Sequence, residues 1–202
     1  MRTNSIGGKL YKPQFFAFLM GMVLIGVLLG TISYCYMSGD FLEKLSLSQT
    51  GFLARREHLN YGEILVKSFS GTTAFLAAAF LLGFCPIGQP VEFAVPLIRG
   101  MGLGVTLAQL YSCFGKQGIV FSLLLVIPGA VISTIALAVG VRESIGLSNI
   151  YMRVSLADRQ VDGLLDTLKL YGAKFLMLEA ALAVSAGIDC LGTVIFQHIG
   201  IF

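Results

Sequence analysis

Long stretches without charged side chains constrain this sequence more than any other feature. Residues 15–36 contain no Asp, Glu, Lys or Arg, and a helix needs about 20 apolar residues to cross a bilayer. Of the 202 residues, 56% are hydrophobic and 12% are charged, whereas a soluble domain has about 25% charged residues. The sequence therefore predicts an integral membrane protein and excludes a water-soluble globular protein.

Apolar segments of this kind recur along the chain, and we expect an all-α polytopic protein with a single membrane domain over residues 1–202. The predicted transmembrane helices cover about 15–36, 69–84, 92–114, 119–141 and 175–196. The first segment is longer than the about 7–15 apolar residues of a signal-peptide core. We therefore expect it to be retained as a membrane anchor.

The Lys and Arg residues outside these segments predict the orientation, because positively charged loops are retained on the cytoplasmic side. An inside N-terminus gives the inner regions the larger share, namely Arg2, Lys9, Lys12, Arg142, Arg153, Arg159, Lys169 and Lys174. The outer regions then hold Lys44, Arg55, Arg56, Lys67 and Lys116. We expect an N-in, C-out protein with five spans, an outer segment at 38–68 and an inner segment at 142–173.

The inner segment contains an amphipathic pattern. Apolar residues follow helical spacing at Val161, Leu164, Leu165, Leu168 and Tyr171, and charged residues occupy the other positions. We expect a short amphipathic helix on the membrane surface or on the inner end of the bundle. A solvated connecting helix is the alternative.

Glycine and alanine pairs four residues apart predict where helices approach each other. The pairs are Gly26 and Gly30, Gly100 and Gly104, and Ala183 and Gly187. Small residues at this spacing allow membrane helices to pack closely. A nucleotide-binding loop is the weaker interpretation of residues 100–104, because that motif requires a preceding strand and GxGxxG spacing.

Three charged residues fall in the interior of the predicted spans, away from the span ends, where a charge is costly and needs a reason. They are Arg99, Glu179 and Asp189. Depth along the spans, estimated from the rise of about 1.5 Å per residue, matches Arg99 better with Glu179 than with Asp189. We expect an intramembrane ion pair between Arg99 and Glu179, and a proton or substrate path is the alternative.

No catalytic, cofactor or metal site is expected from the remaining residues. The cysteines form no CxxC motif, and no protease signature surrounds either histidine; these residues are Cys35, Cys85, Cys113, Cys190, His58 and His198. A Cys35–Cys113 disulfide is left open. The net charge of +3 comes without a dense basic cluster, so we expect no nucleic-acid partner.

The outer segment is too apolar for a freely solvated linker. Its apolar residues are Phe41, Leu42, Leu45, Phe52, Leu53 and Leu59. Apolar surface of this kind either packs on the protein or meets a partner. We expect Phe52, Arg55 and Arg56 to form the main partner surface.

Between residue 69 and about 141 the chain resembles the stage II sporulation protein M family. The stretches that carry the resemblance are Phe69-Ser-Gly-Thr-Thr-Ala-Phe-Leu, Leu82-Gly-Phe-Cys-Pro-Ile-Gly-Gln-Pro, Leu97-Ile-Arg-Gly-Met-Gly-Leu-Gly-Val-Thr, Gly115-Lys-Gln-Gly-Ile and Ile127-Pro128. Residues 40–68 and 142–173 carry no part of it. The five-span, N-in arrangement agrees with this family.

The resemblance implies a bacterial membrane protein that acts during engulfment in endospore formation. Such a protein holds two peptidoglycan-degrading partners, stage II sporulation proteins D and P, at the septal membrane. We therefore expect a membrane scaffold without enzymatic activity, located in the septal and engulfing mother-cell membrane. Whether it forms a homo-oligomer is left open, and a small transporter or permease subunit is the alternative function.

Overall fold

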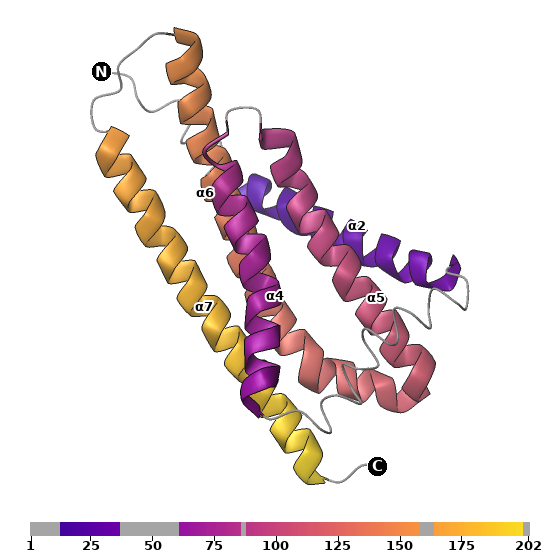
Figure 1. Ribbon diagram of the computed structural model, residues 1–202. Coiled ribbons are helices and arrows are strands. Elements are labelled where there is room, and N and C mark those ends of the chain that lie inside the picture. Colours follow the sequence, from indigo (N-terminus) through magenta and orange to yellow (C-terminus); the bar gives the residue numbers. More distant parts are fainter. Residues whose placement is uncertain (1–12, 37–60, 86–87, 158–163, 200–202) are drawn as a thin grey trace.

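The computed structural model describes residues 13–36, 61–85, 88–157 and 164–199. Within these ranges all regular structure is helical (Figure 1). The helices are α2 (Pro13–Tyr36), α4 (Tyr61–Leu82), α5 (Gln89–Phe121), α6 (Ile127–Ala157) and α7 (Leu164–Ile199), with a π-helical segment, η1 (Ser122–Val126), between α5 and α6. The all-α prediction is confirmed for this part of the chain.

Three of the helices are long and apolar enough to cross a membrane. The segments are Gln14–Tyr36, Gln89–Ser112 and Ile127–Met152. The apolar part of α4 is shorter and covers Phe69–Leu82. The helix itself begins eight residues earlier, at Tyr61. These segments agree with a membrane protein.

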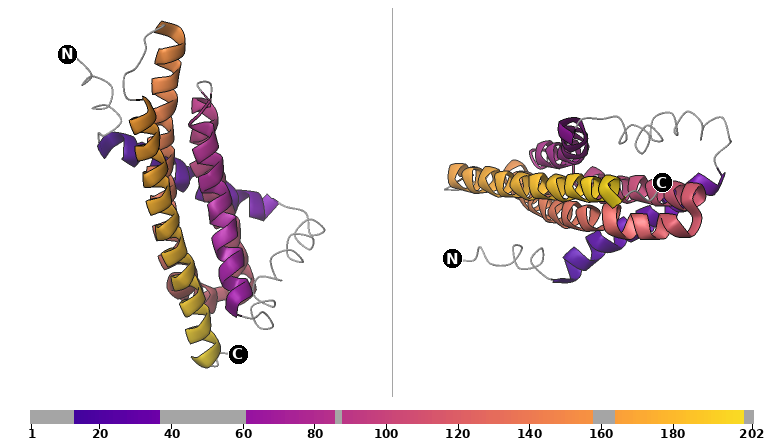
Figure 2. Two further views of the ribbon diagram at one scale, coloured as in Figure 1. Left: turned by 60° about the vertical axis from the view of Figure 1, so that its left-hand side comes forward. Right: turned by 90° about the horizontal axis from the view of Figure 1, so that it is seen from below.

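Helix α6 is central in the bundle. It contacts α2, α4, α5 and α7, and α2 and α4 lie on opposite sides of it (Figure 2). Helix α2 packs mainly on α5 and crosses it obliquely (Figure 1). Helices α4, α6 and α7 pack against one another (Figure 1).

The chain reverses direction between α5 and α6 through two irregular features. Gly115 has a φ of 53° and a ψ of −128°, a conformation that an L side chain rarely adopts. Pro128 follows η1 and cannot donate a backbone hydrogen bond. Across this reversal the Tyr111 hydroxyl lies 3.2 Å from Ser122 Oγ, and that contact ties α5 to η1. The predicted span at 119–141 is therefore divided among α5, η1 and α6.

The separate amphipathic helix expected within 142–173 is not formed by the described residues. Helix α6 continues to Ala157, and α7 already begins at Leu164, so Leu168 and Tyr171 belong to the first turns of α7. Residues 158–163 lie outside the described ranges. Of the apolar residues at that spacing, Tyr171 lies in the bundle core and Leu168 packs against it.

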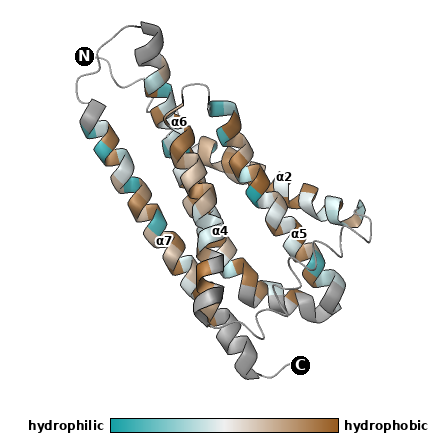
Figure 3. Ribbon diagram, viewed as in Figure 1, coloured by the Kyte–Doolittle hydropathy of each residue, from teal (hydrophilic) through white to brown (hydrophobic). Residues whose placement is uncertain are grey.

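Large apolar side chains cover much of the outer surface. On α2 these include Leu24, Leu28 and Ile32, each more than half exposed, and on α7 they include Leu176 and Met177. Hydrophilic positions of α7 are concentrated toward its N-terminal half (Figure 3). An exposed apolar surface of this extent is expected where lipid surrounds a protein.

Candidate functional site: buried polar groups in the helix bundle

The glycines predicted to mediate packing lie at the crossing of α2 and α5. A Cβ atom on Gly26 would meet the Leu97 carbonyl oxygen and would lie 3.0 Å from the Gly100 Cα. A Cβ atom on Gly100 would meet the Val23 carbonyl oxygen. These contacts involve backbone atoms, which cannot move aside as a flexible side chain can, so the crossing depends on glycine.

One helical turn further along, the same crossing continues. Cβ atoms on Gly30 and Gly104 would meet the carbonyl oxygens of Met101 and Val27, respectively. The third predicted pair is placed differently, because Ala183 is exposed and Gly187 has no heavy atom within 4 Å of a Cβ built on it. The structure thus brings the first two pairs together and leaves Ala183 and Gly187 away from any close helix contact.

Arg99 lies between α5, α6 and α7. Its guanidinium donates a hydrogen bond of 3.2 Å to Ser133 Oγ, and the charge of Asp189 acts on it from α7. The Asp189 carboxylate lies against Gly129, in the space that a side chain at position 129 would need. Ser185, one turn before Asp189, donates 2.8 Å to the Gly129 carbonyl. Arg99 and Asp189 therefore belong to one polar cluster inside the bundle.

The predicted pair between Arg99 and Glu179 is not among the ion pairs of the described residues. Glu179 accepts a 2.6 Å hydrogen bond from Thr73 of α4. The prediction assumed that the apolar segments of α5 and α7 share a midpoint depth. Helix α7 instead runs from Leu164 to Ile199, and its position along the bundle places Asp189 beside Arg99.

A second polar cluster, which the sequence analysis did not identify, surrounds Glu92 near the start of α5. The Glu92 side chain is 0% exposed. Ser144 Oγ of α6 lies 2.7 Å from Glu92 Oε1 and 2.6 Å from the Ala79 carbonyl oxygen of α4. Glu92 Oε2 is buried and makes no hydrogen bond with the described residues.

The same cluster extends to α7 through Tyr171. Its hydroxyl donates 3.0 Å to the Phe80 carbonyl, and its ring stacks on Phe80 with ring centres 5.1 Å apart. A Cβ on Gly83 would lie 2.5 Å from the Tyr171 hydroxyl and 2.8 Å from Ser144 Oγ. Burial raises the pKa of the Tyr171 phenol, and the nearby Ser144 hydroxyl opposes that effect.

The sequence gives no signal that Glu92 is buried. Glu92 lies in the first turn of α5, where an acidic side chain commonly interacts with the helix dipole in water. A position at the boundary of a span therefore gave no reason to expect burial. In the folded protein Glu92 is nevertheless fully buried, with Ser144 Oγ 2.7 Å from its carboxyl group.

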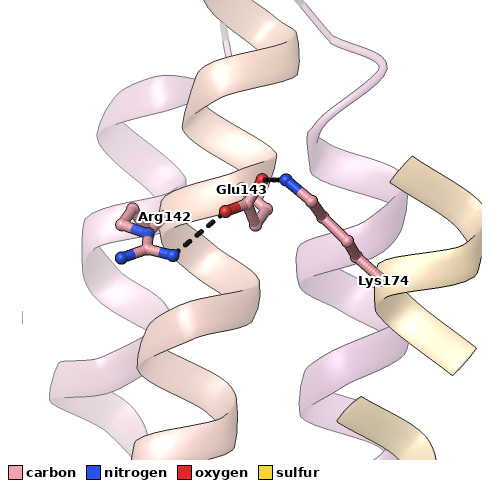
Figure 4. A network of polar contacts seen from close by, with 3 residues as sticks. All are labelled: Arg142, Glu143 and Lys174. Carbon is pink, nitrogen blue, oxygen red and sulfur yellow. Dashed lines mark hydrogen bonds and ion pairs between the residues drawn. The ribbon is translucent and has the colours of Figure 1, made fainter. Parts of the chain in front are cut away.

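An ion-pair network joins α6 to α7 next to this cluster (Figure 4). Glu143 Oε2 lies 2.6 Å from Lys174 Nζ, and Glu143 Oε1 lies 3.1 Å from an Arg142 nitrogen. The Glu143 side chain is 13% exposed. Half-buried ion pairs of this kind fix the relative position of two helices more firmly than exposed pairs do.

Two further hydrogen bonds join the turn between α4 and α5 to α6. Gln89 Nε2 donates 2.9 Å to Asn149 Oδ1, and Ser148 Oγ donates 2.9 Å to the Cys85 carbonyl. The α6 residues of these two bonds, Ser148 and Asn149, follow the end of the predicted span at 119–141. The extension of α6 past that span therefore holds the α4–α5 turn in place.

The predicted partner surface and one cysteine of the possible disulfide fall outside the described side chains. Phe52, Arg55 and Arg56 lie outside the described residues. Cys35 is a free, exposed thiol, whereas the side chain of Cys113 is not described. Among the described side chains, no group of three or more His, Cys, Asp or Glu could hold a metal ion.

The chain matches no protein-family model, no curated protein and no solved structure. Hydroxyl and amide groups join the helices of the bundle, Glu92 is fully buried, and Arg99 and Asp189 are partly buried. Groups in such an arrangement can fix helix positions and can bind or release a proton.

Proposed function

We propose that this protein is a membrane scaffold similar to stage II sporulation protein M. In this proposal it spans the membrane five times, with the N-terminus inside and the C-terminus outside. It holds peptidoglycan hydrolases, stage II sporulation proteins D and P, at the septal membrane during forespore engulfment. Hydrolysis belongs to the partners, and the scaffold raises their effective concentration by tethering.

The observation that supports this proposal is that polar and small residues between 69 and about 141 make contacts between helices or allow the chain to turn. Gly100 and Gly104 support the crossing with α2, Arg99 contacts Ser133 of α6, and Gly115 allows the kink within α5. Each of these residues joins one helix to another or turns the chain. A bundle whose internal groups are engaged in this way provides the fixed platform that a tether requires.

The topology is tested by reporter fusions. A reporter that is active only outside the cytoplasm is fused after Phe202 in one protein and inserted after Lys116 in another. Both fusions are expected to be active, because the proposed topology places both positions outside. An active cytoplasmic reporter at either position would contradict the five-span arrangement.

The scaffold function is tested in sporulating cells that lack this protein. Fluorescent fusions of the two hydrolases are expected to spread over the membrane in those cells and to return to the septum when the protein is restored. Gly100→Leu is expected not to restore the septal signal, because it separates α2 from α5. Gly102→Leu is the matched control, because no heavy atom lies within 4 Å of a Cβ at that position. Hydrolases that reach the septum without the protein would contradict the proposal.

The predicted partner surface is tested separately. Charge reversal at Arg55 and Arg56, or Phe52→Ser, is expected to reduce recovery of the hydrolases with the detergent-solubilised protein while leaving its membrane level unchanged. A fall in the membrane level would mean that these residues only pack on the bundle. The purified protein alone is expected to leave peptidoglycan intact.

A small transporter or permease subunit is the second candidate. The observation that favours it is the burial of ionisable groups within the bundle, since intramembrane acids and arginines often line ion or substrate paths. Proteoliposomes that contain only this protein distinguish the two functions. A proton or solute flux that is lost on Asp189→Asn would favour the transporter, and an absence of flux together with septal recruitment of the hydrolases would favour the scaffold.

A further inference from the structure

The hydrogen bonds around Ser144 require more protons than one serine can provide. A serine hydroxyl carries one proton. Its oxygen nevertheless lies within 2.7 Å of two acceptors, Glu92 Oε1 and the Ala79 carbonyl oxygen. The nearest other hydroxyl, that of Tyr171, donates its own proton to the Phe80 carbonyl. One of the two short contacts to Ser144 therefore needs a proton from elsewhere.

Glu92 is the group that can supply this proton. A neutral carboxylic acid can donate from Oε1 to Ser144 Oγ, and Ser144 can then donate to Ala79. The remaining oxygen, Oε2, is buried without a hydrogen-bond partner. A bare carbonyl oxygen is much less costly to bury than a carboxylate oxygen that carries charge.

Among the described residues, no ion pair joins Glu92 to a cation. On α6 the ionisable residues next to Ser144 are Arg142 and Glu143. On α7 they are Tyr171, which hydrogen-bonds to Phe80, and Lys174. Both cations are engaged by Glu143, at 3.1 Å and 2.6 Å. On α5 itself the next charged residue is Arg99, two turns away, which contacts Ser133.

We propose that Glu92 is a proton-binding site that joins three helices. The proton lies between Glu92 Oε1 of α5 and Ser144 Oγ of α6, and the serine proton lies between Ser144 and the Ala79 carbonyl of α4. Removal of one proton leaves two acceptors for the single serine proton and a buried charge without a partner. Proton release therefore loosens the contact between the C-terminal end of α4 and α6.

The site is tested by infrared spectroscopy of the full chain in lipid nanodiscs. At neutral pH the wild-type protein is expected to show the carbonyl stretch of a protonated carboxylic acid, and Glu92→Gln is expected to lose that band. Ser144→Ala is expected to shift the band to higher frequency, because the acid then lacks its acceptor. Glutamine keeps the shape of the side chain and can donate from its amide to Ser144, so this variant preserves the hydrogen-bond chain.

A rise in pH provides the second measurement. The wild-type band is expected to disappear at alkaline pH together with a fall in the midpoint of thermal unfolding, and this fall is expected to be smaller in Glu92→Gln. Identical spectra for wild type and Glu92→Gln would overturn the proposal. The same spectra are recorded in a buffer whose only added cation is choline and in one that contains sodium. Loss of the band in sodium at neutral pH would also overturn the proposal, because a cation would then occupy the site. If Glu92→Gln does not accumulate, the band shift in Ser144→Ala decides the question alone.

Discussion

Gly26 of α2 and Gly100 of α5 face each other at the helix crossing, and a Cβ added to either would lie 3.0–3.1 Å from the Cα of the other. Such a Cβ would also meet a carbonyl oxygen of the opposite helix. The close approach allows the backbones themselves to make van der Waals contact, which is a main source of helix association in a membrane. Residue size at these two positions therefore sets the distance between α2 and α5.

The first prediction follows from this contact. Gly100→Ala is expected to lower the free energy of unfolding by about 1–3 kcal/mol, as overpacking does in other well-packed interiors. Gly102→Ala is expected to leave it unchanged or to raise it slightly, because the added methyl group meets nothing within 4 Å and alanine favours the helix. Thermal unfolding of both variants in detergent checks the difference. Equal effects of the two substitutions would mean that the crossing does not depend on Gly100.

The second prediction concerns the partner of Arg99. Asp189→Ala is expected to destabilise the protein, because it removes the negative charge that acts on the Arg99 guanidinium from α7. A double replacement, Arg99→Met with Asp189→Leu, is expected to cost less than the sum of the single changes. Unfolding measurements on the two single variants and the double variant give the coupling.

Glu179→Ala serves as the comparison for this cycle. It removes the hydrogen bond from Thr73 and is expected to cost about 1 kcal/mol, without coupling to Arg99→Met. Coupling of Arg99 to Glu179 in place of Asp189 would restore the pair expected from the sequence and contradict the arrangement of α7.

The third prediction compares two lysines of α7. Lys174→Met is expected to destabilise the protein clearly, because Lys174 lies 2.6 Å from the largely buried Glu143. Lys169 pairs with Asp166 at 3.9 Å, with side chains that are 81% and 85% exposed, and exposed pairs contribute about 0–1 kcal/mol. Lys169→Met is therefore expected to change stability little. Thermal unfolding at low and high salt measures both, and the Lys174 effect is expected to be the less sensitive to salt.

The fourth prediction uses the Tyr171 phenol. Burial raises its pKa above the ordinary value of 10.0, so the folded state favours the neutral phenol. The resulting stabilisation is fully present below about pH 10 and is lost as the pH rises toward the raised pKa. Tyr171→Phe is expected to lose the hydrogen bond to Phe80, at a cost of about 1 kcal/mol, and to show a weaker decline in stability at alkaline pH. A wild-type decline that persists fully in Tyr171→Phe would assign it to other groups.

Hydropathy and spacing predicted the helical architecture, because both record which side chains avoid water. They did not predict where α6 ends. Arg142 and Glu143 are polar enough to end an apolar span, but polar residues do not end a helix, and α6 continues to Ala157. The hydropathy pattern therefore located the end of the apolar stretch and missed the end of the helix.

The polar contacts were harder to predict for a related reason. The partner of Arg99 depends on the position of α7 along the bundle axis. The residue types of α7 do not predict that position. The burial of Glu92 depends on Ser144, which is 52 positions away along the chain, and on Tyr171. Such contacts are fixed by tertiary packing, so they become visible only when the helices are placed.

The uninterrupted course of α6 restricts how its sequence can change in length. Each residue inserted into an α-helix turns everything after it by about 100°. One extra residue before Ser144 would rotate Ser144, Ser148 and Asn149 together away from Glu92, Cys85 and Gln89. Insertions and deletions in this stretch therefore act as rotations of a rigid rod, and only changes that approach whole turns keep the three contacts in register.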